Sequence, residues 1–334
     1  MKETTKKRFL KLLAFCTAAG VSASCLPIIS AGAVSEVRDG VHEAAKAVEA
    51  VESVKAFEDF EDYEDFEAIG ASDAVIEDRS VPEGAQRTGV NVNGRRVLEG
   101  RVFVIGGITY VPMFKFADWL GVFEYSTSSN GTVSSGRIDG ENLVITAKEN
   151  GLYITANGRY FYTVGKVLEI SGELYVPITP LVKALNSHLS QSNGVYSVRS
   201  GDTRRLKSAE QFYAEDAVFW LSRIISAEAR GEDLRGKMAV GNVVLNRVRA
   251  AQFPNTIYGV IFDKKFGTQF APTANGTIYN EPTAESIIAA KMCLEGYSVT
   301  NTALYFFNPR YTSGSWVREN REYAFTIGNH VFYN

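Results

Sequence analysis

The chain has 334 residues, of which 45% are hydrophobic and 22% charged, a composition typical of a globular protein long enough for two domains. Its formal net charge of −3, its three cysteines and its three histidines exclude a basic nucleic-acid surface, a disulfide scaffold and a zinc site of four thiolates. We therefore expect chemistry based on carboxylates and neutral polar groups, with no metal, no cofactor and no nucleic-acid partner.

The N-terminus predicts an export signal. Basic residues precede an apolar stretch over 12–29, and the sequence SAGA at 30–33 supplies the small residues of a cleavage site. We expect removal of residues 1–33 and secretion of the mature chain to the cell wall or a spore. No second apolar stretch of about 18 residues follows, so no membrane span is expected in the mature chain. A membrane anchor is the alternative, although Gly20 and Pro27 interrupt the apolar run.

Residues 34–87 are expected to form a disordered, acidic linker. Positions 34–80 hold 15 acidic and four basic residues, and a triplet of one aromatic and two acidic residues repeats over 57–66. This period matches neither a strand nor a helix, and dense like charge resists compaction, so only one weak helix is predicted, over Val41–Val54. The alternative is a docking tail for a cationic partner.

Residues 88–200 contain a duplicated β-rich pattern. The sequence VNGR at 92–95 matches ANGR at 156–159, and GITYVP at 107–112 matches GELYVP at 172–177. Each Tyr-Val-Pro precedes a short helical pattern, and each Asn-Gly pair predicts a tight hairpin turn. The predicted unit is a hairpin, a strand and a short helix, made twice.

This duplicated pattern resembles the copper amine oxidase N-terminal-like domain of secreted bacterial proteins. Copper is not expected, because His188 is the only histidine in the segment and one imidazole does not hold Cu(II). The segment offers no catalytic set of residues, so it is either a spacer fold or a module that binds the wall or a wall-associated partner. Tyr160, Phe161 and Tyr162 are candidates for stacking on sugars, with burial in a core as the alternative.

The strongest catalytic candidate lies in residues 210–334, on a helix predicted over Asp216–Arg230. Glu228 falls four and seven positions after apolar residues, so helical spacing puts its carboxylate on the apolar stripe. A carboxylate in such surroundings is either paired or has a raised pKa, and a raised pKa suits a general acid. Glu232 falls beyond the helix end, and we expect it to be the more exposed of the two.

Two further helices are predicted, one over 234–250 and one from Pro282 to Gly296. The first is apolar on nearly all sides and must be largely buried. Its polar residues Asn242 and Asn246 therefore need partners, which are each other, neighbouring loops or a substrate.

Two residues of reactive types are assigned structural roles. Cys293 lies in the apolar run of the last helix and is expected to be a small buried hydrophobe. His330 follows a Gly-Asn hairpin turn, and we expect a hydrogen-bonded structural histidine there, with catalysis as the alternative.

Residues 213–334 resemble the catalytic domain of SleB-type cell wall hydrolases, the spore cortex-lytic enzymes. The resemblance rests on five runs: AEARGE at 227–232, AVGNVVLNRV at 239–248, QF at 269–270, ALYFFNP at 303–309 and IGNHVF at 327–332. It implies an α+β, lysozyme- and lytic-transglycosylase-like domain that acts on peptidoglycan, with Glu228 as the catalytic acid. The duplicated module stands where relatives often carry a repeat-type peptidoglycan-binding domain, which leaves a role in spore germination open.

The expected reaction is glycan cleavage between N-acetylmuramic acid and N-acetylglucosamine by one glutamate, because no second carboxylate can be located by spacing. Gln269 and Tyr305 are candidates for orienting the sugar, and Tyr279 and Trp316 for stacking on it. One alternative is a non-catalytic wall-binding or scaffold protein. Another is a peptidoglycan amidase or peptidase, which would need a zinc cluster or a Cys–His pair that the residue counts do not supply.

Overall fold

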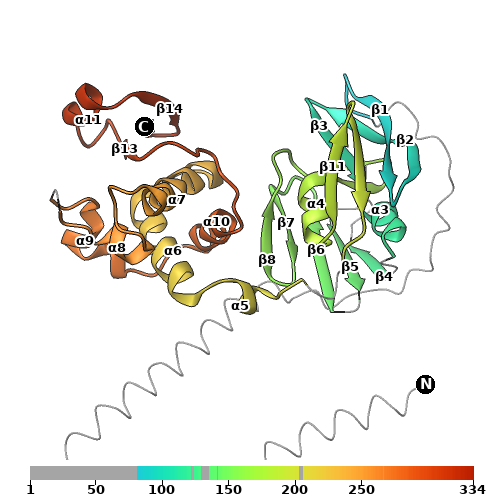
Figure 1. The fold of residues 1–334 in the computed structure, drawn as a ribbon, viewed down its shortest axis with the longest axis horizontal. Coiled ribbons are helices and arrows are strands. Elements are labelled where there is room, and N and C mark those ends of the chain that lie inside the picture. Colours follow the sequence, from blue (N-terminus) through green and yellow to red (C-terminus); the bar gives the residue numbers. More distant parts are fainter. Residues whose placement is uncertain (1–80, 122–123, 129–134, 141, 203–205, 266) are drawn as a thin grey trace, which may run out of the picture. The chain divides into compact units, whose positions relative to one another are not determined.

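The computed structural model describes residues 81–121, 124–128, 135–140, 142–202, 206–265 and 267–334 (Figure 1). The expected export signal, the helix over Val41–Val54 and most of the acidic linker lie outside these residues. The described residues comprise a β module over 81–202 and a C-terminal domain over 206–334, so the fold combines a strand-rich part with a helix-rich part. Within them, no helix combines the length and the apolar character needed to cross a membrane.

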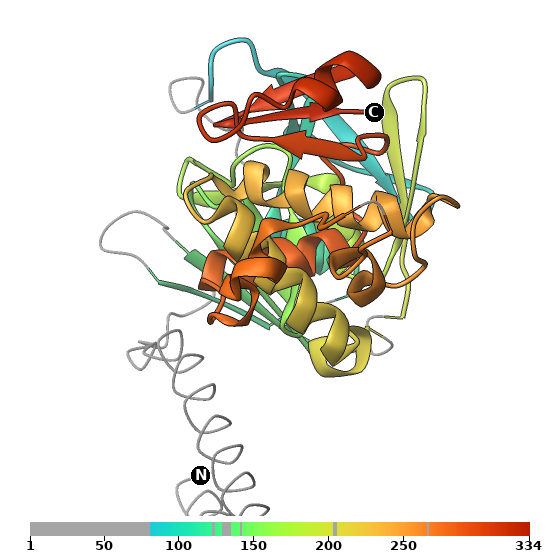
Figure 2. The same cartoon turned by 90° about the vertical axis from the view of Figure 1, so that its left-hand side faces the viewer.

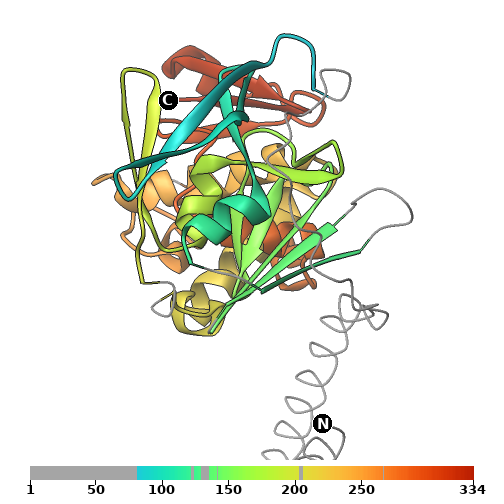
Figure 3. The same ribbon diagram turned by 90° about the vertical axis from the view of Figure 1, so that its right-hand side faces the viewer.

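The β module is built from two sheets and two short helices (Figure 3). The larger sheet has the order β11-β12-β1-β2-β3-β10-β9, with strands β1 (Gln86–Val92), β2 (Arg95–Ile105), β3 (Ile108–Pro112), β9 (Leu168–Ile170), β10 (Glu173–Pro177), β11 (His188–Ser192) and β12 (Val195–Arg199). The other has the order β4-β5-β6-β7-β8, with strands β4 (Glu124–Ser128), β5 (Ser135–Gly140), β6 (Leu143–Lys148), β7 (Tyr153–Ala156) and β8 (Arg159–Tyr162). The helices are α3 (Met113–Trp119) and α4 (Ile178–Ala184), and α4 contacts strands of both sheets. The first strand begins at Gln86, slightly before the predicted range 88–200.

The two Asn-Gly pairs form the predicted hairpin turns. Asn93-Gly94 joins β1 to β2 with φ angles of 50° and 81°, and Asn157-Gly158 joins β7 to β8 with 50° and 75°. Positive φ at both central residues matches the right-handed twist of the flanking strands, and asparagine followed by glycine adopts it at low cost. The predicted order of hairpin, strand and short helix is confirmed in the first copy, as β1–β2, β3 and α3. In the second copy the additional strand β9 lies between the β7–β8 hairpin and β10, which precedes α4.

The two copies of the repeat meet at equivalent positions. Strands β3 and β10 pair antiparallel with Val111 opposite Val176, and these are the central residues of the two Tyr-Val-Pro runs. Pro112 and Pro177 then immediately precede α3 and α4. A proline suits this place because it has no backbone N–H to leave unpaired at the start of a helix.

The C-terminal domain consists of a helical core and a small sheet (Figure 2). Its helices are α5 (Ala209–Phe212), α6 (Glu215–Ala229), α7 (Leu234–Arg249), α8 (Ile257–Ile261), α9 (Ala271–Asn275), the 3-10 helix η3 (Thr277–Tyr279), α10 (Ala284–Leu294) and α11 (Ser315–Asn320). The sheet has the order β13-β15-β14, from strands β13 (Tyr305–Phe307), β14 (Tyr323–Ile327) and β15 (His330–Tyr333). Helices α6, α7 and α10 pack on one another around the apolar core, as the sequence pattern of each predicts.

The two buried asparagines of α7 hold the loop that follows α10. Asn242 Nδ2 donates to the carbonyl oxygen of Tyr297 at 3.1 Å, and its Oδ1 accepts from Val299 N at 2.7 Å. Asn246 Nδ2 donates to the carbonyl oxygens of Thr300 and Ala303 at 3.1 and 3.0 Å. The prediction that they need partners is confirmed, and the partners belong to a neighbouring loop. Each side-chain amide supplies hydrogen bonds to buried backbone groups of this loop, which have no access to water.

The three aromatics proposed for sugar stacking on β8 are buried or partly buried. Phe161 is fully buried inside the β module, and Tyr160 and Tyr162 pack against the core of the C-terminal domain. The hypothesis that the ring stacks on sugars is therefore wrong for Phe161, and packing against the core favours the alternative, burial, for Tyr160 and Tyr162. Cys293 is only 2% exposed, which confirms that it is a buried apolar residue.

Candidate active site

A cleft of about 400 Å³ opens at the C-terminal end of α6. Glu228, in the last turn of α6, is the only carboxylate among the described residues that line it. The other lining residues are Arg223, Ser226, Ala227, Arg230, Ala271, Pro272, Asn275, Thr277 and Asn280. Residues of α9 and η3 form the wall opposite α6. Most of the lining residues are polar, and the cleft is open to solvent and contains one acid.

The environment of Glu228 favours its protonated form. The side chain is partly buried, and burial raises the pKa of Glu228 to about 7, against an opposing effect of Arg247. Its position in the last turn of α6 acts in the same direction as burial, because a helix C-terminus carries partial negative charge. In the part of the chain that the structure describes, no hydrogen bond or ion pair engages this carboxylate, so the proton it holds is available to a ligand.

Arg247, on α7, is the cation whose charge acts on Glu228. Its side chain is almost fully buried, and its Nε donates to the carbonyl oxygen of Leu304 at 2.7 Å. The guanidinium lies 5.0, 5.1 and 5.5 Å from the centroids of three rings, those of Phe253, Phe270 and Tyr305. Burial lowers the pKa of Arg247 to about 10, which leaves it charged at neutral pH. This fixed positive charge keeps the pKa of Glu228 from rising further.

Glu232 is buried, which corrects the expectation that it would be more exposed than Glu228. It is 8% exposed, and its Oε1 and Oε2 accept from Asn329 Nδ2 at 3.0 Å and Asn329 N at 3.2 Å. The chain turns directly after α6, where Glu232 N donates to the carbonyl oxygen of Ala229, and this turn aims the carboxylate at the β14–β15 hairpin. Counting residues along the helix could not reveal a partner 97 positions away.

His330 belongs to the same structural cluster. It is 5% exposed, and its Nδ1 lies 3.4 Å from Glu232 Oε1. Burial lowers the pKa of His330, while Glu232 opposes that effect. The predicted structural role is supported, since its contact is with the carboxylate that fixes the hairpin.

Two of the predicted substrate-binding residues lie together. Tyr305, on β13, and Trp316, on α11, have ring centroids 6.2 Å apart. The guanidinium of Arg321 lies 4.7 Å from the Tyr305 ring and 5.0 Å from the Trp316 ring. Trp316 is 55% exposed, so part of its ring is open to solvent.

The other two predicted residues lie elsewhere. Tyr279 is 62% exposed and lies between two residues that line the cleft, Thr277 and Asn280. The Gln269 amide donates to the carbonyl oxygen of Gly267 at 3.3 Å, and Gln269 is not among the lining residues. The roles of Gln269, Tyr279, Tyr305 and Trp316 in binding stay predictions.

Sequence reasoning missed the cations around Glu228. Arg223 and Arg230 line the cleft, and Arg223 Nη2 forms an ion pair with Glu281 at 2.7 Å. The sequence could have indicated Arg230, because it lies two positions after Glu228 at the end of the same helix. Arg247 carried no such signal, since only the packing of α7 against α6 brings its charge near Glu228.

A second cleft, of about 620 Å³, lies on the β module. It is lined by residues of the β11–β12 hairpin and the β1–β2 turn, including His188, Arg199 and Asn93. No carboxylate is among its lining residues in the described part of the chain. It therefore offers no carboxyl group that could act as a general acid, and the cleft beside Glu228 is the candidate active site.

Comparison with known proteins assigns the C-terminal domain. Residues 231–333 match the Cell Wall Hydrolase family. A spore cortex-lytic enzyme of Bacillus cereus is 36% identical over 120 residues, which cover 36% of this chain and 45% of that protein. The cell wall hydrolase CwlJ of Oceanobacillus iheyensis is 33% identical over 101 residues, which cover 28% of this chain and 70% of that protein.

A solved structure is also similar. The catalytic domain of the germination-specific lytic transglycosylase SleB from Bacillus anthracis is 35% identical, with 36% of this chain and 97% of that chain covered and a TM-score of 0.34. The chain spans less than half the length of the spore cortex-lytic enzymes it matches. The family match begins three positions after Glu228, and it includes Glu232, Arg247 and His330.

Proposed function

Since the chain belongs to the cell wall hydrolase family, we propose that it cleaves the glycan strands of peptidoglycan between N-acetylmuramic acid and N-acetylglucosamine. The observation that carries this proposal is the state of Glu228. It is a lone acid in an open cleft, with a pKa raised to about 7 by burial. A carboxyl group that is about half protonated at neutral pH can donate to a glycosidic oxygen.

The proposed mechanism uses Glu228 twice. Glu228 first donates its proton to the glycosidic oxygen, and the bond from that oxygen to C1 of N-acetylmuramic acid breaks. The C6 hydroxyl of the same sugar then bonds to C1 and gives its proton to the Glu228 carboxylate. The product is a 1,6-anhydro end, no water is consumed, and the acid is restored for the next cycle.

The setting of the reaction is part of the proposal. The basic and apolar N-terminus supports export, so the substrate is the cell wall or the spore cortex. The curated relatives named spore cortex-lytic enzymes favour cortex. The β module, with its likeness to copper amine oxidase N-terminal-like domains, is proposed to contact the wall or a wall-associated partner.

Mass analysis of peptidoglycan fragments tests the proposal. The wild-type chain should release fragments with anhydro-muramic ends, one water lighter than hydrolysis products. Glu228→Gln keeps the size of the side chain but cannot deliver a proton, so turnover should fall by about 10²–10⁴-fold. Glu215→Gln is the matched control, because Glu215 lies exposed at the other end of the same helix.

Each alternative gives a different result in that experiment. Reducing N-acetylmuramic ends would mean a hydrolase with a water-activating base. Fragments cut in the peptide stem would mean an amidase or peptidase. Activity that survives in Glu228→Gln would remove this carboxylate from the mechanism, and no cleavage by the wild-type chain would favour a non-catalytic wall-binding protein.

A further inference from the structure

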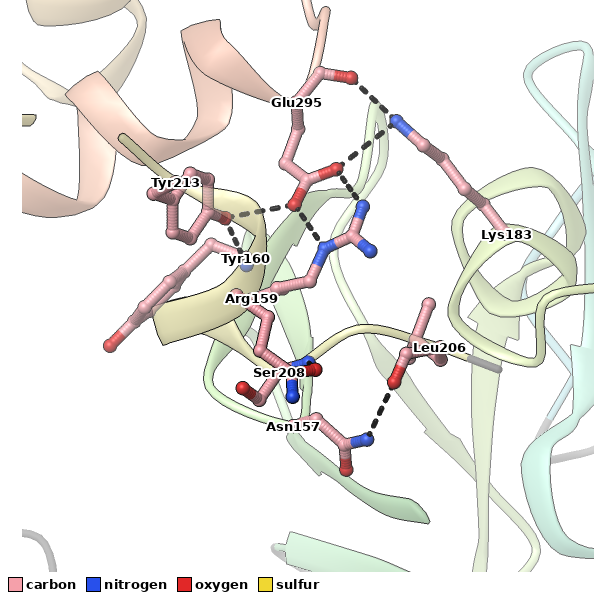
Figure 4. Close-up of polar contacts among 9 residues, drawn as sticks. Asn157, Arg159, Tyr160, Lys183, Leu206, Ser208, Tyr213 and Glu295 are labelled. Atoms are coloured by element: carbon pink, nitrogen blue, oxygen red, sulfur yellow. Dashed lines mark hydrogen bonds and ion pairs between the residues drawn. The ribbon is translucent and has the colours of Figure 1, made fainter. Parts of the chain in front are cut away.

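A fully buried carboxylate joins the β module to the C-terminal domain. Glu295 directly follows α10, and its side chain is 0% exposed. Arg159, the first residue of β8, donates to both carboxylate oxygens, from Nε at 2.7 Å and from Nη2 at 2.8 Å (Figure 4). A planar guanidinium that meets a carboxylate through two parallel hydrogen bonds fixes the orientation of both elements, and not only their distance.

Two further groups complete this cluster. Lys183, on α4, lies 3.5 Å from Glu295 Oε2 and donates to the Glu295 backbone oxygen at 2.6 Å, so it places a cation at the C-terminal end of α10 (Figure 4). The hydroxyl of Tyr213, between α5 and α6, donates to Glu295 Oε1 at 2.9 Å and accepts from Tyr160 N at 3.2 Å. The carboxylate of Glu295 thus binds Arg159 and Lys183 of the β module, and Tyr213 of its own domain links it to the backbone of β8.

The surface around the cluster is apolar. Tyr153, Tyr160 and Tyr162 of the β module pack against the core of the C-terminal domain, and Tyr297 packs against the cores of both. The Arg159 guanidinium lies 3.5 Å from the centroid of the Phe212 ring, which belongs to the connecting helix α5. Apolar burial combined with a satisfied buried charge is typical of a permanent contact and not of a tether between independent domains.

The internal duplication provides a comparison inside the same chain. Arg95 occupies in the first copy the place of Arg159 in the second, but it is exposed and lies 5.1 Å from the Trp119 ring. Asp118 occupies the place of Lys183, so the first copy has an acid where the second has a cation. The first copy could not bind the Glu295 carboxylate in the same way. Only the second copy carries the docking residues.

We propose that the second repeat of the β module is a dedicated docking surface for the end of α10, with Glu295 as its anchor, so that the two parts form one catalytic body. Helix α10 packs on α6, which carries Glu228, and on α7, which carries Arg247. Docking therefore holds the helices that shape the cleft, and Glu295 is a positioning residue for the proposed reaction. The positioning role of Glu295 rests on the proposed function, whereas the docking itself does not.

The test compares Arg159→Gln with Arg95→Gln in the full chain. Each change removes the arginine of one of the two equivalent Asn-Gly-Arg turns, but only Arg159→Gln breaks the buried pair. Arg159→Gln should lower the melting temperature, split one calorimetric transition into two, and speed limited proteolysis of the folded chain by about tenfold or more. Arg95→Gln should match the wild type in all three measurements. If Arg159→Gln does not fold, Tyr213→Phe removes only one hydrogen bond from Glu295 and should give smaller shifts in the same direction.

Activity on short soluble glycan fragments tests the positioning role. A module that only tethers the enzyme to the wall would affect insoluble walls alone, because soluble fragments need no tether. The inference predicts that Arg159→Gln loses activity on both substrates and through kcat more than KM. Wild-type melting and proteolysis in Arg159→Gln would overturn the docking, and unchanged soluble-fragment activity despite faster proteolysis would overturn the positioning. If the wild-type chain cleaves no glycan, the proposed function fails while the melting and proteolysis results still decide the docking.

Discussion

Glu228 makes the proposed activity dependent on pH near neutrality. Its pKa is raised to about 7, and the first step needs the protonated form. We expect kcat/KM on soluble glycan fragments to be constant below pH 7 and to fall about tenfold per pH unit above it. Initial rates between pH 5 and 9 measure this. A rate that stays constant to pH 9 would mean that Glu228 does not act as the acid.

The same carboxyl group is expected to cost stability when it ionises. The pKa of Glu228 is about 7 in the folded chain against 4.5 for the free side chain, so the folded state binds more protons between these values. Stability therefore falls as pH rises from about 4.5 to 7. Glu228→Gln should be more stable than the wild type at pH 8, by on the order of 3 kcal/mol, and equal to it at pH 4.

Urea unfolding at the two pH values measures this difference. Glu215→Gln is again the control, because an exposed carboxylate at the start of α6 should give nearly the same free energy of unfolding as the wild type at both. A Glu228→Gln variant that is less stable at pH 8 would show that the carboxylate is paired and not strained. This measurement needs no substrate, so it tests the environment of Glu228 separately from the reaction.

At the scale of elements, the β14–β15 hairpin depends on Gly328 because Glu232 lies against it. A Cβ atom at this position would be 1.8 Å from Glu232 Oε2, and the backbone has a φ of 53°. Gly328→Ala should therefore lower the free energy of unfolding in urea by about 2 kcal/mol or more, a larger loss than backbone strain alone explains.

Gly276→Ala isolates the contribution of the backbone. Gly276 follows α9 with a φ of 81°, and nothing lies within 4 Å of a Cβ there, so the substitution should cost only about 1 kcal/mol. Equal losses in the two variants would mean that the Glu232 contact moves away without cost. A larger loss in Gly328→Ala identifies the cluster of Glu232, Asn329 and His330 as what holds the hairpin.

Local signals in the sequence were sufficient for most of these elements. The helix predicted over Asp216–Arg230 is Glu215–Ala229, because apolar spacing and an acidic first turn determine it. The Asn-Gly turns follow from backbone sterics at two residues. Glu228 could be proposed from spacing and resemblance, but the burial of Glu232 could not, because a turn of the chain and a distant hairpin decide it.

At the scale of the whole molecule, the sequence contained the residues of the domain contact but not their pairing. Arg159 and Glu295 are 136 positions apart, and no periodicity links them. The duplication could be predicted from the sequence. That only the second copy contacts Glu295 could not, because this depends on how the two parts pack. The proposed docking predicts that the β module and the C-terminal domain act as a single body, whereas the division into a binding module and a separate enzyme stays a prediction.

The acidic segment at 34–80 is expected to act through its length and not through its charge. It carries 15 acidic and four basic residues, a density that repels both itself and anionic wall polymers. Replacing every Glu by Gln and every Asp by Asn within 34–80 preserves the length. This variant should cleave walls within about twofold of the wild type at 0.15 M salt, where charges further apart than about 8 Å are largely screened.

A deletion of the same segment separates reach from charge. If the segment is a spacer, the deletion should slow cleavage of insoluble walls and leave soluble fragments unaffected, because only an anchored or crowded substrate requires reach. If the segment is a docking tail for a cationic partner, the neutral variant should lose wall activity as strongly as the deletion does. The difference from the wild type should then disappear at high salt, because salt weakens the charge contact of the wild type as well. Release of labelled wall fragments at 0.05 and 0.5 M salt distinguishes the two, since a charge-based contact weakens with ionic strength and a length-based one does not.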